Sequence, residues 1–203
     1  MSVHDDRIDG EADSSRRHFL LVATTVTGLA GAALTAVPFL ASWRPSARAQ
    51  ALGAPVEVDI SKIEMGEMIK VEWRGQAIYI VRRTPQMLEL LNNHDPLLRD
   101  PKSEESEQPA YAKNGTRSVN PEFLVAIGVC THLGCAPLSR FTAGEADLGA
   151  SWPGGFYCPC HGSKFDLAGR VFKDVPAPTN LRIPPYRFMA DTRLLIGSDT
   201  GAG

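Results

Sequence analysis

Two hexapeptides constrain this chain more than any other feature, because together they hold all four of its cysteines. CTHLGC occupies residues 130–135 and CPCHGS occupies residues 158–163, and each also carries one of the chain's five histidines. The hexapeptides are too short and too widely separated to indicate a repeat architecture. Since one site can use both sets of side chains only if they meet, we interpret the hexapeptides as two halves of one site.

The composition bounds the kind of protein. The chain has 203 residues, of which 43% are hydrophobic, and this suits one folded domain with an appendage. Its formal net charge is -2, with charges of both signs interspersed along the chain. No basic face of the kind that follows a phosphate backbone is implied, so we expect no nucleic-acid partner.

An uncharged apolar stretch covers residues 19–43. A helix needs about 20 apolar residues to cross the bilayer core, so this stretch is long enough to span a membrane. The two arginines before it, Arg16 and Arg17, precede Phe-Leu and match the bacterial twin-arginine export pattern. That pathway exports folded proteins, which suits a protein that receives a metal cofactor before export.

These features predict the order of the domains. We expect a cytoplasmic N-terminus over residues 1–18, a transmembrane anchor over residues 19–43, a flexible tether over residues 44–55 and a folded domain over residues 56–203. The folded domain is then expected on the periplasmic side of a bacterial inner membrane. A cleaved signal, with an A-x-A pattern at residues 47–49, and a buried core helix are the alternatives for the apolar stretch.

The pattern of the folded domain is mainly that of β-strands. Apolar and polar residues alternate over residues 54–63 and 66–83, with a turn at residues 74–76, and predict antiparallel strands. A short helix is expected near Pro85, where helical spacing follows a Thr-Pro start. Residues 99–122 are polar and are interpreted as a surface excursion.

Each hexapeptide follows an apolar run. FLVAIGVC ends at Cys130 and GGFYCPC contains Cys158, which predicts that buried strands carry both cysteines to loops. Cys130 with His132, and Cys158 with His161, then form two mixed arms. Four cysteines in an exported protein ordinarily predict two disulfides, which leaves these histidines unexplained. Zinc binds two Cys and two His, but its usual arms pair like ligands, and one cysteine of each hexapeptide is left over.

CTHLGC and CPCHGS resemble the two boxes of the Rieske iron–sulfur family, which have one Cys and one His in each loop with a spare Cys beside them. The resemblance implies a Rieske-type antiparallel β-sandwich with a small cluster-binding subdomain over about residues 128–180. It also implies one [2Fe–2S] cluster, with Cys130 and Cys158 on one iron and His132 and His161 on the other.

Further roles follow from the same resemblance. Cys135 and Cys160 are implied to form a disulfide between the two loops, which an extracytoplasmic location permits. Ser163 is implied to donate its hydroxyl to a bridging sulfide, and Leu133 to shield the cluster from water. Phe165 occupies the position where mitochondrial members place a Tyr that bonds a ligand sulfur. Loss of that donor favours the oxidised state, so we expect a lower reduction potential than in the Tyr-bearing members.

Within the family, the chain resembles the bacterial form of the Rieske subunits of cytochrome bc1 complexes. The spare cysteines and VPAP at residues 175–178, which looks like the proline loop of those subunits, carry this resemblance. It implies a membrane-anchored electron-transfer subunit of a dimeric, proton-translocating quinol–cytochrome c reductase, with cytochrome b and cytochrome c1 as partners. The cluster is implied to take one electron from quinol at cytochrome b and to pass it to cytochrome c1. A proton goes to His161, so His161 and its neighbour ligand His132 are the implied catalytic residues.

Two other functions stay open. The small Rieske subunit of a periplasmic oxidase such as arsenite oxidase uses the same cluster and export route. A zinc or disulfide domain without redox chemistry would use the same cysteines. Of the remaining residues, Trp73 is expected to be a core aromatic, and His4, His18 and His94 are expected to be exposed and without function.

Overall fold

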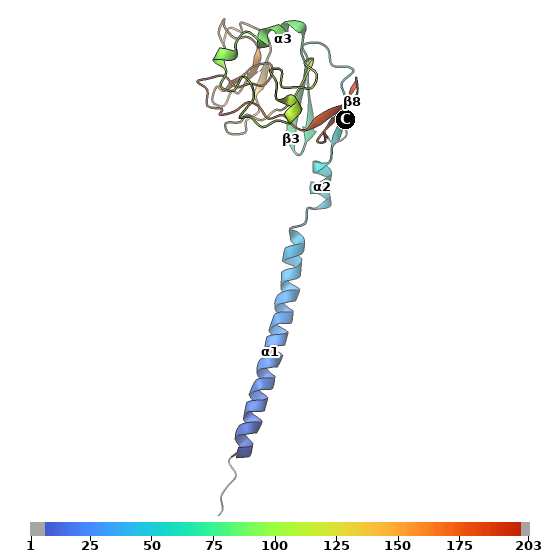
Figure 1. The fold of residues 1–203 in the computed structure, drawn as a ribbon, viewed down its shortest axis with the longest axis vertical. Coiled ribbons are helices and arrows are strands. Elements are labelled where there is room, and N and C mark those ends of the chain that lie inside the picture. Colours follow the sequence, from blue (N-terminus) through green and yellow to red (C-terminus); the bar gives the residue numbers. More distant parts are fainter. Residues whose placement is uncertain (1–6, 200–203) are drawn as a thin grey trace, which may run out of the picture. The chain divides into compact units, whose positions relative to one another are not determined.

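The computed structural model describes residues 7–199, and the chain divides into two compact units, Met1–Gln50 and Ala51–Gly203. The first unit contains one long helix, α1, which spans Arg7–Ser42 (Figure 1). The helical stretch Asp13–Gly53, most of which is α1, is long and apolar enough to cross a membrane, judged by length and composition. Its large apolar side chains are exposed, as suits a helix whose surroundings are lipid.

A short helix, α2, spans Ala47–Gly53, within the segment that the sequence predicts to be a tether. Ser46 caps it, because the Ser46 hydroxyl oxygen accepts a hydrogen bond from the Ala49 N–H at 3.1 Å. None of the residues of α2 is buried. The alanine-rich composition of this segment also favours a helix, since alanine has the highest helix propensity. The segment is therefore partly helical, and its flexibility stays a prediction.

In the described part of the second unit, residues 51–199, the strands form three antiparallel sheets of three strands each. The first sheet has the order β1 (Val56–Asp59), β9 (Arg193–Ile196), β8 (Tyr186–Ala190). The second sheet has the order β2 (Met68–Trp73), β3 (Gln76–Arg82), β4 (Phe123–Ile127). The third sheet has the order β5 (Leu138–Arg140), β6 (Gly155–Tyr157), β7 (Lys164–Phe165). The prediction of a mainly β fold made of antiparallel strands is confirmed.

The β2–β3 hairpin shows how the local sequence sets the register. Trp73, which is buried as predicted, lies opposite Gln76, so Arg74 and Gly75 form the turn. Both turn residues have positive φ angles, 53° and 71°, as a type I′ turn requires. Residues 78–81 of β3 are all buried, which is typical of a strand covered on both faces.

Helix α3, Pro85–Leu91, begins where the sequence predicts a helix. The Thr84 hydroxyl oxygen accepts a hydrogen bond from the Met87 N–H at 3.2 Å and caps the helix. Pro85 takes the first helical position, where its missing N–H costs no intrahelical bond. Two short 3₁₀ helices follow, η1 (Asp95–Leu97) and η2 (Ala110–Ala112).

The interpretation of residues 99–122 as a polar surface excursion is wrong in part. Five of its polar side chains are buried: Asp100, Ser103, Ser106, Arg117 and Ser118. Each of them has hydrogen-bond partners, which is the condition under which polar side chains can leave water. Several of these partners lie more than 50 residues further along the chain, so the local sequence pattern does not reveal them.

His94 also contradicts its prediction, because the structure buries it. Its Nε2 atom lies 3.4 Å from Oδ2 of Asp166, and its ring stacks on that of Phe172 with 5.8 Å between the centroids. His94 therefore belongs to the polar interior of the second unit. His18 is exposed, as predicted, and His4 lies outside the described residues.

Three buried arginines, Arg83, Arg117 and Arg170, lie near Asp166 and form what we call the arginine cluster. Arg170 Nε donates to Asp166 Oδ2 at 2.7 Å, and both side chains of this ion pair are buried. Arg83 and Arg117 donate mainly to backbone carbonyls. Burial lowers the pKa of both guanidinium groups to about 10, although the charge of Asp166 raises it. Since Asp166 directly follows β7, this polar interior adjoins the third sheet.

Candidate metal centre

Two strands carry the cysteines of the hexapeptides, as predicted. β4 is buried along its whole length and ends at Ile127, three residues before Cys130. β6 ends at Tyr157, directly before Cys158. Cys130 and Cys158 are each 2% exposed, and neither takes part in a disulfide. The fold thus places two thiols at the ends of two strands, away from bulk water.

Residues 130–135 form the first loop, which is closed by its own backbone. The Cys130 N–H donates to the carbonyl oxygen of Cys135 at 2.8 Å, and the Gly134 N–H donates to that of Cys130 at 3.0 Å. Gly134 has a φ of 84°, a conformation that glycine adopts without a steric penalty. The six residues of CTHLGC therefore form a single tight turn.

Residues 158–163 form the second loop, which repeats this construction. The Cys158 N–H donates to the carbonyl oxygen of Ser163 at 2.8 Å, and the Gly162 N–H donates to that of Cys158 at 2.9 Å. Gly162 has a φ of 78°, close to that of its counterpart in the first loop. The two loops are equivalent turns, and their six positions can be compared one by one.

A disulfide between Cys135 and Cys160 joins the two loops, with the Cα atoms 6.7 Å apart. This is the pairing that the family resemblance implies. The sulfur atoms of Cys135, Cys158 and Cys160 all lie within 4.8 Å of one another. Sulfur in a disulfide is not a thiolate, so only Cys158 of these three can bind a metal.

The two loops also bring two imidazoles together. The ring centroids of His132 and His161 lie 4.8 Å apart, and the ring planes are nearly perpendicular, at 89°. His132 is half-buried, whereas His161 is exposed. All four side chains that the sequence predicts to be ligands therefore lie on two adjoining, cross-linked loops.

The four predicted donors do not form one converging group. Among the described residues, Cys135, Cys158 and Cys160 are the one group of three or more whose possible ligand atoms all lie within 4.8 Å of one another. Four ligands at about 2.0–2.3 Å from one zinc ion would meet that condition easily. Two irons, each held by one pair of ligands, do not require the four ligand atoms to converge on one point.

The electrostatics of the buried thiols also fit a metal. Burial raises the pKa of the Cys130 thiol, and the neighbouring Cys158 raises it too, while hydrogen bonds from the His132 amide and the Ser163 hydroxyl lower it. A thiolate buried in this way needs a compensating positive charge. A bound metal cation supplies that charge, so the site is suited to metal ligation.

Residues 175–180 contact both loops. The Ala177 N–H donates to Oγ of Ser163 at 3.1 Å, and the Thr131 hydroxyl donates to the carbonyl oxygen of Thr179 at 2.7 Å. Ser163 is 0% exposed, so its hydroxyl group acts in a dry site. No local pattern singles out Thr131, because its partner lies 48 residues further along the chain.

The residues expected to tune the cluster differ in burial. Leu133 is 71% exposed on the outside of the first loop, and its shielding role stays a prediction. Phe165 is fully buried, opposite Phe156 in the β6–β7 pair.

Tyr79, which no sequence pattern singles out, stacks on Phe156 with 5.8 Å between ring centroids. Burial and the charge of Cys158 raise the pKa of Tyr79, so it stays a neutral neighbour of the second loop.

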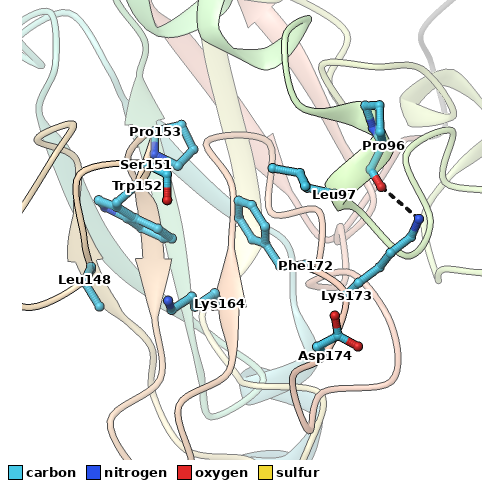
Figure 2. A pocket seen from close by; sticks show the side chains of 10 residues that line it. All are labelled: Pro96, Leu97, Leu148, Ser151, Trp152, Pro153, Lys164, Phe172, Lys173 and Asp174. Carbon is cyan, nitrogen blue, oxygen red and sulfur yellow. Dashed lines mark hydrogen bonds between the residues drawn. The ribbon is translucent and has the colours of Figure 1, made fainter.

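A pocket of about 230 Å³ begins beside the second loop, because Lys164 lines it and directly follows Ser163. Figure 2 shows Trp152 and Phe172 within this pocket, and their ring centroids are 5.8 Å apart. Lys173 also lines the pocket, where its ammonium group is held by a carbonyl oxygen at 2.8 Å. Neither of the two loops contributes a lining residue, so the pocket is separate from the metal centre.

Two adjoining loops that each offer a thiol and an imidazole define an iron–sulfur domain of the Rieske class. Comparison with family models agrees, since a model described as "Rieske [2Fe-2S] domain" matches residues 55–186. A second model, "Ubiquitinol-cytochrome C reductase Fe-S subunit TAT signal", matches residues 8–46. The protein accordingly holds one Rieske-type [2Fe–2S] cluster, which replaces the zinc and disulfide alternatives that spacing alone left open.

Sequence comparison with curated relatives shows which family of Rieske proteins the chain belongs to. The chain is 58% identical over 187 residues to the ubiquinol-cytochrome c reductase iron-sulfur subunit of Allochromatium vinosum, a match that covers 92% of this chain and 90% of the relative. It is 44% identical over 184 residues to the subunit of the same name from Bradyrhizobium diazoefficiens, covering 90% and 94%. A chain of a solved structure described as "Hyperthermophilic respiratory Complex III" is 27% identical with a TM-score of 0.43, covering 85% of this chain and 97% of that chain. The sequence matches show that the chain belongs to the family of Rieske iron–sulfur subunits of ubiquinol–cytochrome c reductase.

Proposed function

We propose that this chain is the membrane-anchored electron-transfer subunit of a quinol–cytochrome c reductase. Its partners are cytochrome b, which holds the quinol, and cytochrome c1, which receives the electron, in a dimeric complex that translocates protons. Membership of the family and the high identity to reductase subunits over nearly the whole chain support this proposal.

Cys130 and Cys158 hold one iron of the cluster, and His132 and His161 hold the other. The burial of both thiols and the neighbouring positions of both imidazoles support this assignment. When bound, a cluster with two neutral imidazoles in place of two thiolates supplies a one-electron acceptor of raised reduction potential. The protein itself excludes water from the two thiols and leaves one imidazole accessible to solvent.

His161 is the residue that meets the quinol. One observation carries this choice: His161 is exposed, whereas His132 in the first loop is half-buried. An exposed imidazole nitrogen accepts a hydrogen bond from a quinol hydroxyl and then holds the proton that leaves it. Leu133, which is also exposed, offers an apolar contact to the wall of a quinone pocket.

The first unit anchors the protein in a bacterial inner membrane, with the second unit on the periplasmic side. The apolar, exposed surface of α1 and the match of residues 8–46 to a twin-arginine signal support the anchor. Residues 44–55 then act as the tether that lets the second unit reach both cytochromes. Since α2 occupies part of this segment, the tether is a short helix with irregular ends.

Electron paramagnetic resonance of dithionite-reduced membranes tests the proposal. We expect a Rieske signal that changes position when an inhibitor of the quinol-oxidising pocket is added, because the inhibitor contacts His161. A signal whose position does not change with the inhibitor, and that appears in the soluble fraction, would contradict the proposal. It would favour the small subunit of a periplasmic oxidase. Solubilised membranes from which cytochrome b has been removed serve as the control, since the shift must then disappear.

A further inference from the structure

Asn180 lies in a buried polar group just after the proline-rich segment, and its side chain makes hydrogen bonds to three other residues. Its Oδ1 atom accepts a hydrogen bond from the Val171 N–H at 2.8 Å, and its Nδ2 atom donates to the Asp100 carbonyl oxygen at 2.9 Å. Nδ2 also lies 3.1 Å from Oγ of Ser103, and the Asn180 N–H donates to Oγ of Ser106 at 3.1 Å. Asn180 is 0% exposed, so these bonds stand in for water.

Asp100 completes this group. Its carboxylate accepts hydrogen bonds from the N–H groups of Glu104, Glu105 and Ser106 and from the Ser106 hydroxyl, at 2.6 to 3.2 Å. Burial raises the pKa of Asp100, but these bonds outweigh burial and hold the pKa below its ordinary value. The carboxylate therefore organises residues 100–106 into a fixed turn. We call Asp100, Ser103, Ser106 and Asn180 the polar clamp.

The polar clamp holds Asn180 close to two residues that contact the loops of the metal centre. Thr179, one residue before Asn180, accepts the Thr131 hydroxyl of the first loop. Ala177, three residues before Asn180, donates to the Ser163 hydroxyl of the second loop. A shift of Asn180 along the chain direction would move both contacts at once, because residues 177–180 form one short connected segment.

We propose that Asn180 is a positioning residue for the iron–sulfur cluster, acting through Ala177 and Ser163. Because the Ser163 oxygen accepts the Ala177 N–H, the Ser163 hydroxyl proton is left to point toward the sulfur atoms of the centre. A hydrogen bond to sulfur stabilises the more negative, reduced state of a cluster. Asn180 thus raises the reduction potential without touching the cluster. This inference rests on the proposed ligand assignment, and it adds to it a residue outside both loops.

The test compares Asn180→Ala with a matched control in the full-length chain, in native membranes. Ser118→Ala is the control, because Ser118 is also buried and its hydroxyl makes two hydrogen bonds outside the polar clamp, one from Arg83 Nη2 at 2.7 Å and one to Thr116 Oγ1 at 3.2 Å. We expect Asn180→Ala to shift the midpoint potential of the Rieske signal to a more negative value. Release of iron to a chelator should become at least about tenfold faster, because the variant loses the buried side-chain hydrogen bonds of Asn180 to three residues. The control should keep the wild-type potential.

An unchanged potential in Asn180→Ala, or an equal shift in Ser118→Ala, would overturn the inference. If Asn180→Ala does not assemble a cluster, Ser106→Ala decides, since it removes two bonds of the polar clamp and leaves the Asn180 side chain in place. It must then show a smaller negative shift, and a wild-type potential would count against the inference. A wild-type protein without any Rieske signal would instead contradict the ligand assignment, so the two failures are distinguishable.

Discussion

The two loops of the metal centre have the same backbone hydrogen bonds but present different side chains at equivalent positions. The histidine stands at the third position of the first loop, His132, and at the fourth position of the second, His161. The fourth position faces outward in both loops, since Leu133 and His161 are both exposed. A shift of one residue in the sequence therefore leaves His161 exposed and His132 half-buried.

The sixth positions differ as well. Cys135 ends the first loop and forms the disulfide to Cys160, whereas Ser163 ends the second loop and is buried against Ala177. The first loop is thus tied covalently to its neighbour. The second loop carries the other half of this disulfide, and it is also held by the hydrogen bond between Ser163 and Ala177. Equivalent turns can therefore end in different contacts, a disulfide cysteine in the first loop and a buried hydroxyl in the second.

The largest expected effect comes from replacing the exposed fourth-position histidine. His161→Ala should remove the Rieske signal completely, because one iron loses a ligand that no neighbour can replace. Leu133→Ala, the change at the equivalent position of the first loop, should leave the signal in place. Electron paramagnetic resonance of the two variants, normalised to protein content, makes the comparison. A Rieske signal of wild-type shape in His161→Ala would exclude it as a ligand.

Replacing the buried Asp166, which follows the second loop, should have the next largest effect. Asp166→Asn should destabilise the protein by about 3–5 kcal/mol at pH 7, because the buried charge of Arg170 loses its buried partner and keeps only the half-exposed Asp95. Asp147→Asn is the control, since Asp147 pairs with Arg140 at the surface, and no measurable change is expected. Denaturant unfolding followed by circular dichroism measures both. Equal stability of the two variants would show that the arginine cluster does not support this loop.

The same residue predicts a pH dependence. Burial raises the pKa of Asp166, but hydrogen bonds and charge from His94 and Arg170 outweigh it and hold the pKa below its ordinary value. The stabilisation is then fully present above the pKa of the unfolded chain, about 3.9, and is lost as the pH falls through the lower folded value. We expect the unfolding free energy of the wild type to decrease when the pH drops under about 4. The unfolding free energy of Asp166→Asn should decrease less steeply over the same pH range. Parallel slopes would contradict this assignment.

Breaking the covalent link between the loops should cost somewhat less. The disulfide closes a loop of 25 residues, so replacing both Cys135 and Cys160 by Ser should lower the unfolding free energy by about 3 kcal/mol. The variant should also lose iron to a chelator faster than the wild type, because the two loops can separate. Equilibrium unfolding and chelator kinetics check the two effects. Wild-type stability in the double variant would mean that the hydrogen bonds alone hold the loops together.

The smallest effect concerns Phe165, buried at the end of β7. Phe165→Tyr should raise the reduction potential by about 40 mV, if its hydroxyl adds one hydrogen bond of about 1 kcal/mol to a ligand sulfur. Phe172→Tyr, beside the pocket of Figure 2, is the control and should leave the potential unchanged. A redox titration of the Rieske signal measures both variants. An unchanged or lower potential in Phe165→Tyr would contradict the expected role of this position.

The sequence predicts best what is encoded locally. The hexapeptides, the turn at Arg74 and Gly75, and the helix start at Thr84 depend on neighbours within a few residues, and the structure confirms where the cysteines, the turn and the helix lie. The α2 helix is also encoded locally, since its alanines favour a helix, but the small polar residues, proline and glycine of the segment predict a linker.

The sequence predicts poorly what depends on distant partners. His94 is buried because of Asp166, which lies 72 residues further along the chain. Asn180 bonds to Asp100, 80 residues before it. Neither residue has a local pattern that indicates burial, and both belong to polar segments. Their environment follows only from the packing of the β-sheets, which brings these segments together.

Pulsed electron paramagnetic resonance of the reduced protein, labelled with ¹⁵N only in histidine, tests the central claim most directly. We predict coupling of the cluster to two histidine nitrogens, one from His132 in the first loop and one from His161 in the second. A cluster without histidine coupling, or with coupling to a single histidine, would contradict the assignment of one thiol and one imidazole to each loop.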